Sequence, residues 1–111
     1  MTLRELSLAF AFLSLAICPV RAESGMAAFY GGGRTASGEI TTPSGLWAAH
    51  RTLPFGTMVL VTNVRNGKTV VVRIVDRGPY GRGRIIDVSR AAARELDMIK
   101  SGTTMVSVVR Q

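Results

Sequence analysis

The chain has 111 residues, a formal net charge of +7, one cysteine and one histidine. A chain of this length forms one small domain. A single cysteine cannot form an internal disulfide, and a single histidine leaves no ligand set for a structural zinc ion. The basic excess favours an anionic partner.

The first residues have the three-part layout of a secretory signal peptide. A basic end, Met1–Arg4, precedes the apolar run Leu6–Ile17, and Val20-Arg21-Ala22 places suitable residues before a cut. The apolar run is too short to span a bilayer comfortably. We therefore predict a signal peptide over residues 1–22, a mature domain over residues 23–111, and export to the periplasm or cell envelope without stable membrane insertion.

Cys18 is a candidate lipid attachment site because it follows the apolar run. Lipoprotein processing requires a small residue before the cysteine, whereas Ile17 is bulky, and Pro19 follows directly. Cleavage after Ala22 would also remove the cysteine. A soluble form is therefore favoured over a lipid-anchored one.

In the mature region, short apolar runs alternate with glycine-containing turns, a pattern typical of a small all-β barrel or sandwich. Two runs rich in branched residues, Thr57–Val64 and Lys68–Val75, flank Asn66-Gly67. Asn-Gly is the favoured pair for a tight turn with positive φ, so these runs predict a β-hairpin.

One helix and a closing strand are expected after the hairpin. Residues 89–96 are rich in helix formers, and Ser89 is a suitable N-cap. Ala92, Ala93 and Leu96 would share a small buried face. Thr103–Val109 reads as the last strand.

Asp76 is the first candidate catalytic residue, because it ends the apolar strand Lys68–Asp76. Side chains alternate across a strand, so regular geometry would put Asp76 on the same face as Ile74. Partial desolvation at the rim of an apolar surface would raise the carboxyl pKa toward the value that a general acid needs, and Arg77 would oppose this. Residues 76–79 are equally a good turn sequence, in which Asp76 would be structural.

The other polar and aromatic candidates have simpler alternatives. Glu39 lies in the polar loop Thr35–Glu39, where a solvated carboxylate is the usual state. His50 follows the run Leu46–Ala49, so it is either a hydrogen-bonded packing residue or an acid–base group. Aromatic side chains such as Tyr30 and Tyr80 can stack on sugars or fill a core.

Arginines are dense between residues 77 and 90, which favours an anionic polymer as the partner. Nucleic acid is disfavoured because the chain is expected to be exported and has no recognition-helix pattern or interleaved aromatic motif. A cell-wall polymer with carboxylates or phosphates fits that compartment better. The alternative is a merely soluble basic surface.

Several long blocks resemble, in order, the catalytic domain of the rare lipoprotein A family, the septal ring lytic transglycosylases. The resemblance covers residues 25–110. The blocks are Tyr30-Gly31, Thr35–Glu39, Ala48–Thr57, Val61–Asn63, Asn66-Gly67, Asp76–Tyr80 and Arg84–Ala93.

This resemblance implies a mainly β fold, a six-stranded double-psi β-barrel with one short helix near Ser89–Leu96. It implies cleavage of peptidoglycan between N-acetylmuramic acid and N-acetylglucosamine, leaving 1,6-anhydromuramoyl ends, on strands that lack stem peptides. No metal or organic cofactor is expected, and the protein is expected to be a monomer. The residues expected to be catalytic are Asp76, Glu39 and His50, and those expected to bind substrate are Tyr30, Thr35, Ser37, Arg77 and Tyr80.

The implied chemistry requires few groups, because the sugar's own C6 hydroxyl attacks the anomeric carbon. Asp76 would act as both acid and base, Glu39 would stabilise developing positive charge or tune Asp76, and His50 would hold the site's hydrogen bonds. The better-known members are lipoproteins with a C-terminal glycan-binding repeat, so septal targeting is not expected to carry over.

Three other functions remain open. Expansins share the barrel and loosen polymers without cutting them, so a non-catalytic wall-binding module is the first alternative. A hydrolase on the same barrel would use Asp76 and Glu39 as acid and base at a suitable separation. A basic structural protein that holds anionic wall polymer is the third alternative, and its binding would fall steeply with salt.

Overall fold

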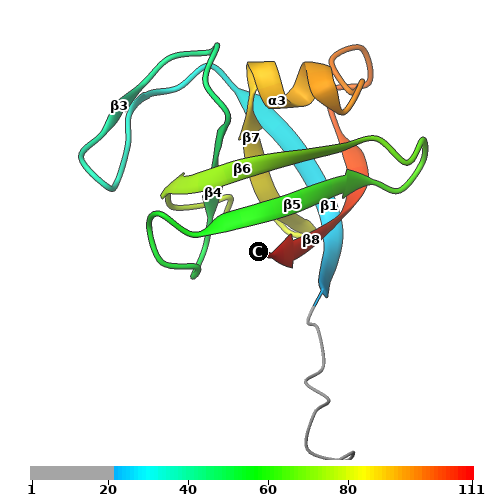
Figure 1. Cartoon of the computed structure of the whole chain (residues 1–111), viewed down its shortest axis with the longest axis horizontal. Coiled ribbons are helices and arrows are strands. Elements are labelled where there is room, and N and C mark those ends of the chain that lie inside the picture. Colours follow the sequence, from blue (N-terminus) through cyan, green and yellow to red (C-terminus); the bar gives the residue numbers. More distant parts are fainter. Residues whose placement is uncertain (1–21) are drawn as a thin grey trace, which may run out of the picture.

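Six strands close into a barrel in the computed structural model, which describes residues 22–111 (Figure 1). Around the barrel the order is β1-β7-β4-β6-β5-β8. The predicted signal peptide and Cys18 lie outside the described residues, except for Ala22, the first residue of β1. The barrel strands are β1 (Ala22–Tyr30), β4 (Trp47–His50), β5 (Met58–Asn63), β6 (Thr69–Asp76), β7 (Arg84–Ser89) and β8 (Thr104–Arg110).

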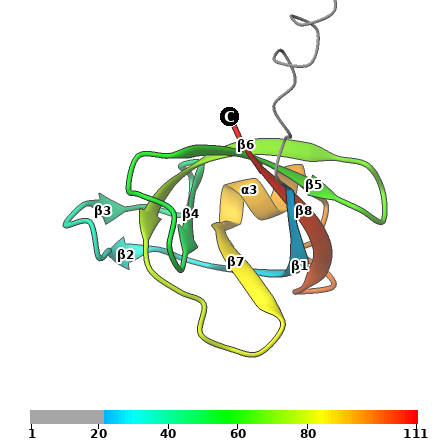
Figure 2. The ribbon, with the colours of Figure 1, turned by 90° about the horizontal axis from the view of Figure 1, so that it is seen from below.

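Two of the six strand pairs are parallel, β1 with β7 and β4 with β6, and the other four are antiparallel. Two short strands, β2 (Gly33–Arg34) and β3 (Ile40–Thr41), form a small separate sheet. This sheet projects from the side of the barrel, next to β4 (Figure 2). The predicted six-stranded, mainly β fold is confirmed.

The β5–β6 hairpin is confirmed, but its turn is wider than the sequence suggested. Thr62 pairs with Thr69, and the Asn63 N–H donates to the Lys68 carbonyl, so four residues, 64–67, form the connection. Of the Asn66-Gly67 pair only Gly67 has a positive φ, 79°. The tight turn expected at Asn66-Gly67 is wrong, because the Asn66 Oδ1 accepts the Lys68 N–H and shapes a longer loop.

The helix α3 (Arg90–Glu95) follows β7 directly, with Ser89 as its N-cap, as predicted. Ser89 Oγ accepts the Ala92 N–H at 3.2 Å and donates to the Gly45 carbonyl at 2.6 Å. Ala92 and Ala93 are buried against the core. Figure 1 shows α3 at one end of the barrel, while the start of β1 and the end of β8 lie at the other end.

Alternation along the strands separates an inner from an outer face. Inward positions carry small and branched apolar side chains that fill the barrel, as the limited interior of a six-stranded barrel requires. The buried core consists of Ala27, Ala48, Val59, Val61, Val70, Val72, Ile74, Ile86, Val88, Val106 and Val108 from the strands, with Ala92, Ala93, Leu96 and Met98 from α3 and its end.

Within residues 22–111, no helix is both long and apolar enough to cross a membrane.

Candidate functional site

Asp76 lies on the outer face of the barrel, because β6 is irregular just before it. Ala48 pairs with Ile74, but the next residue, Ala49, pairs with Asp76, so Val75 is an extra residue in β6. Such a bulge re-aims the side chain that follows it. The expectation that Asp76 shares a face with Ile74 is therefore wrong, since Ile74 points into the core and Asp76 points outward.

Three donors hold the Asp76 carboxylate. The Tyr30 hydroxyl donates to Oδ2 at 2.6 Å, and the N–H groups of Ala36 and Arg77 donate to Oδ1 at 2.8 and 2.9 Å. Burial raises the pKa of Asp76, but these hydrogen bonds and the Arg77 charge outweigh it, so the pKa lies below its usual value. The raised pKa expected from the sequence is thus wrong for the unliganded site.

Tyr30 is the side chain that ties β1 to this carboxylate. It lies at the end of β1 with its ring edge against Trp47, at a centroid separation of 5.0 Å. Burial, the hydrogen bond to Asp76, and the charges of Asp76 and Asp87 together raise the pKa of the Tyr30 hydroxyl far above its usual value. Tyr30 is therefore a neutral hydrogen-bond donor to Asp76.

The loop between β2 and β3 is folded by its own hydroxyl groups. Thr35 Oγ1 donates to the Glu39 carbonyl at 2.7 Å and lies 3.0 Å from Ser37 Oγ, which accepts the Glu39 N–H. The Ser37 N–H donates to the Val75 carbonyl. In this structure Thr35 and Ser37 thus shape the loop that presents the Ala36 N–H to Asp76.

Glu39 faces a neighbouring arginine rather than Asp76. Arg73 on β6 donates to both carboxylate oxygens of Glu39, at 2.9 and 2.5 Å. The hydrogen bonds from Arg73 lower the pKa of Glu39, desolvation opposes this, and the charge of Arg73 lowers the pKa further. The structure therefore places Glu39 beside the strand that carries Asp76, with its charge compensated by Arg73.

A second carboxylate, Asp87, shares the outer face with Asp76. Ala49 pairs with Asp76 on one side and with Asp87 on the other, so the three side chains point the same way. Two strand spacings separate the two aspartates, roughly 10 Å between Cα atoms. We call Tyr30, Ala49, Asp76 and Asp87 the carboxylate face.

Arg84 accompanies Asp87. Its Nη2 donates to Asp87 Oδ1 at 2.7 Å, whereas its buried Nε has no hydrogen-bond partner among the described residues. Sequence reasoning missed Asp87 as a site residue. The signal was present, since Asp87 is a carboxylate inside the apolar strand Ile85–Val88, but only the pairing with Ala49 shows that it lies level with Asp76.

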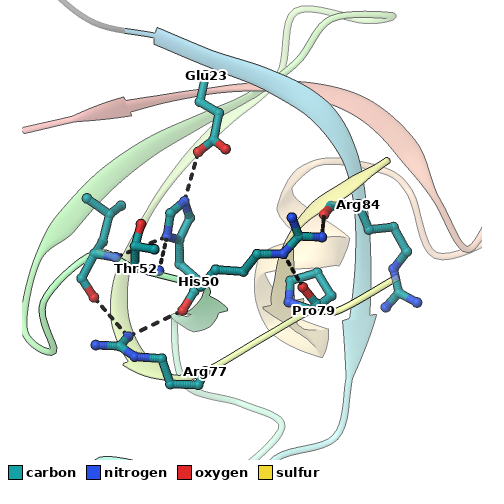
Figure 3. A network of polar contacts seen from close by, with 8 residues as sticks. Glu23, His50, Thr52, Arg77, Pro79 and Arg84 are labelled. Carbon is teal, nitrogen blue, oxygen red and sulfur yellow. Dashed lines mark hydrogen bonds and ion pairs between the residues drawn. The ribbon is translucent and has the colours of Figure 1, made fainter. Parts of the chain in front are cut away.

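His50 lies on the opposite side of the barrel wall from Asp76. It pairs with the core residue Ile86 and is only 5% exposed. Its Nδ1 accepts the N–H groups of Thr52 and Leu53, each at 3.2 Å, so Nε2 carries the proton and donates to Glu23 Oε1 at 2.8 Å (Figure 3). The structure does not bring the ring of His50 together with Asp76.

Two arginines link the β4–β5 and β6–β7 loops reciprocally. Arg77 Nη1 donates to the carbonyls of His50 and Leu53, at 3.3 and 2.9 Å. Arg51 in turn donates to the carbonyls of Pro79 and Gly81 in the other loop and of Arg84 at the start of β7; Figure 3 shows the contacts with Pro79 and Arg84. Arg77 therefore connects His50 with Asp76: its side chain donates to the His50 carbonyl, and its backbone N–H is one of the three donors to Asp76.

Among the residues expected to bind substrate, Tyr80 is the most open. Tyr80 lies in the β6–β7 loop, four residues past Asp76, and is 79% exposed, so its ring is free to stack on a sugar ring. The Arg77 guanidinium is instead occupied, by the two carbonyls and by the Phe55 ring, 4.0 Å from its centroid. Phe55 is itself 42% exposed, and no sequence pattern selected it as a site residue.

The closed mixed barrel defines the class of the fold, the double-psi β-barrels, and solved structures agree. The chain is similar to the Streptomyces papain inhibitor, with a TM-score of 0.67 and 24% identity over 85% of this chain and 98% of that one. It is also similar to an expansin of Clavibacter michiganensis, solved with cellohexaose, with a TM-score of 0.66 and 21% identity over 82% of this chain and 50% of that one. At these identities the likeness is one of fold.

A family model described as "Lytic transglycolase" matches residues 22–108, and the chain belongs to this family. The chain is 57% identical, over 76% of its length, to the "Probable endolytic peptidoglycan transglycosylase RlpA" of Nostoc sp.. It is 54% identical, over 78% of its length, to the "Endolytic peptidoglycan transglycosylase RlpA" of Pasteurella multocida. The matched regions cover only 24% and 31% of these two relatives.

Proposed function

We propose that this protein is an endolytic peptidoglycan lytic transglycosylase that cleaves between N-acetylmuramic acid and N-acetylglucosamine during cell-wall remodelling. The observation that carries the proposal is the Asp76 carboxylate, held on an outer face by three donors and level with a second carboxylate, in a chain whose relatives bear that name. Glycan strands, with or without their stem peptides, are the proposed partner, and the proposed location is the cell envelope outside the inner membrane.

The reaction needs one group that first gives and then takes a proton. Protonated Asp76 gives its proton to the glycosidic oxygen as the C1–O bond breaks. The C6 hydroxyl oxygen of the muramic acid then bonds to C1 and closes the 1,6-anhydro ring, and its proton returns to Asp76. No water is consumed, and the carboxyl ends in the protonation state in which it began.

Substrate binding must protonate Asp76, since the hydrogen bonds of the free site favour its charged form. Burial already raises the pKa of Asp76. A sugar ring laid over the carboxylate face would exclude water and raise that pKa further. A ring that also displaces the Tyr30 hydroxyl from Oδ2 would remove one stabilising donor. Both effects raise the pKa of Asp76 in the complex toward the range of a working acid.

The other carboxylates act around this centre. Asp87, which accepts a hydrogen bond from Arg84, faces the same surface and would stabilise positive charge developing at the anomeric carbon. Glu39 would tune Asp76 by holding its loop to β6 through Arg73, which keeps the Ala36 N–H on Asp76. His50 would act from inside the wall, by ordering the residues whose carbonyls hold Arg77.

The test is incubation of the protein with purified sacculi and with amidase-stripped glycan strands, followed by mass spectrometry of the soluble products. Anhydro-ended fragments are expected from the wild type, and far fewer from Asp76→Asn in the same time. Reducing ends in place of anhydro ends would show water attack and a hydrolase. A preference for stripped strands would appear as a higher rate on that substrate.

A non-catalytic wall-binding module is the second candidate, and the lowered pKa of Asp76 favours it. A carboxylate that stays charged can bind hydroxyl groups without ever donating a proton. In that case both substrates would be retained by the protein in a pull-down, no new chain ends would form, and Asp76→Asn would weaken binding rather than abolish turnover.

A further inference from the structure

The open end of the barrel, opposite α3, contains a pocket that the proposed reaction does not use. Its volume is about 410 Å³, within the range of small-molecule sites. We call it the barrel-mouth pocket, and its lining residues are Glu23, His50, Thr52, Leu53, Val108 and Arg110. Asp76 and Asp87 lie on the other side of the wall and do not line it.

The pocket carries opposite charges on adjacent strands. Glu23 on β1 pairs with Val108 on β8, and Arg110 is two residues further along β8 on the same face. Side chains at such diagonal positions have Cα atoms about 7–8 Å apart. Glu23 and Arg110 are not ion-paired with each other, and the Glu23 side chain is 49% exposed with Oε1 bonded to His50. One carboxylate oxygen and one guanidinium thus border the same space.

Between these charges the pocket offers short polar and apolar surfaces. The Nε2–H of His50 donates to Glu23 and holds its carboxylate at the pocket. Thr52 adds a hydroxyl group, and Leu53 and Val108 form apolar walls. His50 is fixed as the Nε2–H tautomer, because two backbone N–H groups point at Nδ1. The ring therefore holds the Glu23 carboxylate in place without competing for its second oxygen.

We propose that the barrel-mouth pocket binds a small zwitterion, a free amino acid or dipeptide, with its ammonium group on Glu23 and its carboxylate on Arg110. A simple anion would be repelled by Glu23, and a simple amine would be repelled by Arg110. Neutral sugar would leave both charges without a partner. Only a ligand that carries both charges a few ångströms apart satisfies both ends, and the volume admits one or two residues.

The test uses alanyl-alanine as the probe and amide chemical shifts of the wild-type protein as the readout. Saturable shifts are expected at the residues of the barrel-mouth pocket. N-acetyl-alanyl-alanine lacks the ammonium group and alanyl-alanine amide lacks the carboxylate, so each should bind about two- to fivefold more weakly, as exposed ion pairs allow. Equal binding of all three probes, no saturable shift, or shifts confined to the carboxylate face would overturn the proposal.

Variants assign the two ends. Glu23→Gln keeps an acceptor for His50 but removes the negative charge. It should therefore bind alanyl-alanine and N-acetyl-alanyl-alanine with equal affinity. Arg110→Gln should erase the advantage of the free carboxylate, and Lys100→Gln, outside this pocket, should change neither. Binding is measured without turnover, so its outcome is separate from that of the lytic reaction: Asp76→Asn should bind the dipeptide like the wild type.

Discussion

The carboxylate face and the barrel-mouth pocket lie on opposite sides of the same wall, and they use their polar groups differently. On the outer face, Asp76 and Asp87 are held by donors yet remain partly open. At the mouth, His50 is 5% exposed and both of its ring nitrogens are already bonded. Adjacent residues of β4, Ala49 and His50, belong to the two different regions.

The difference shows how a residue can matter to a reaction without touching the reacting atoms. Asp76 can meet a glycan substrate directly, whereas the ring of His50 lies on the other side of the wall, with both nitrogens bonded to protein groups. Its influence passes through Leu53, whose carbonyl accepts from Arg77, and then through the Arg77 N–H to Asp76. Variants on the two sides should therefore separate turnover from stability.

The largest effect is expected for Asp76→Asn, which should lower the rate of glycan cleavage about 10²–10⁴-fold, the range for loss of a general acid–base group. The fold should persist, since the amide oxygen can still accept the N–H groups of Ala36 and Arg77. Product formation and the thermal unfolding midpoint would be measured together. A variant that unfolds in parallel with its loss of activity would make Asp76 structural.

His50→Gln should show the reverse pattern. We expect a loss of about 1–3 kcal/mol in unfolding free energy, because the partly buried N–H groups of Thr52 and Leu53 lose their acceptor. Activity should fall because residues 51–57 become less ordered. Faster amide hydrogen exchange in these residues should therefore accompany the loss of activity. A well-folded His50→Gln protein with unchanged exchange and no activity would show that the ring acts on substrate, contrary to the geometry.

Tyr30→Phe removes one donor from Asp76 and should raise the pKa of Asp76 toward its usual value. The hydrogen bonds that depress the folded-state pKa stabilise the fold above the unfolded pKa of about 3.9, and this contribution is lost as pH falls through the folded pKa. The variant should therefore lose about 1 kcal/mol near neutral pH. Its deficit relative to wild type should shrink below about pH 4.

The same variant should also change the pH–rate profile. If Asp76 acts as the acid, its raised pKa should move the falling alkaline limb of activity to higher pH. Denaturant unfolding at several pH values and initial cleavage rates would measure the two effects. An unchanged limb with a stability loss would exclude Asp76 as the proton donor.

The smallest effect on stability is expected for Glu39→Gln, because its partner is an exposed arginine and such pairs contribute little. The unfolding midpoint should change less than in His50→Gln. Without the contact to Arg73, the loop that presents the Ala36 N–H to Asp76 should be held less firmly. The rate of glycan cleavage should therefore fall, and kcat should drop more than KM rises. Arg73→Gln is the matched variant, and it should reproduce the kinetic loss if Glu39 acts through that contact.

Much of the fold was predictable from local patterns. The branched runs around Asn66-Gly67 predicted the hairpin, and Ser89 before an alanine-rich segment predicted α3 and its cap. The turn length was not predictable, because the Asn66 side chain bonds a backbone group that the pattern does not reveal. The resemblance to a known family located Asp76, but not the direction in which it points.

What the sequence determined by itself is the alternation of apolar residues, the turn and cap residues, and the presence of carboxylates at strand ends. These are local properties, fixed by side-chain chemistry and backbone preference. The tertiary structure decided the rest. The extra residue Val75 turned Asp76 outward, the parallel pairing of β4 with β6 and the antiparallel pairing with β7 set Asp87 level with it, and the closure of the barrel enclosed His50. Each of these depends on contacts between strands distant in sequence, so no local pattern contains them.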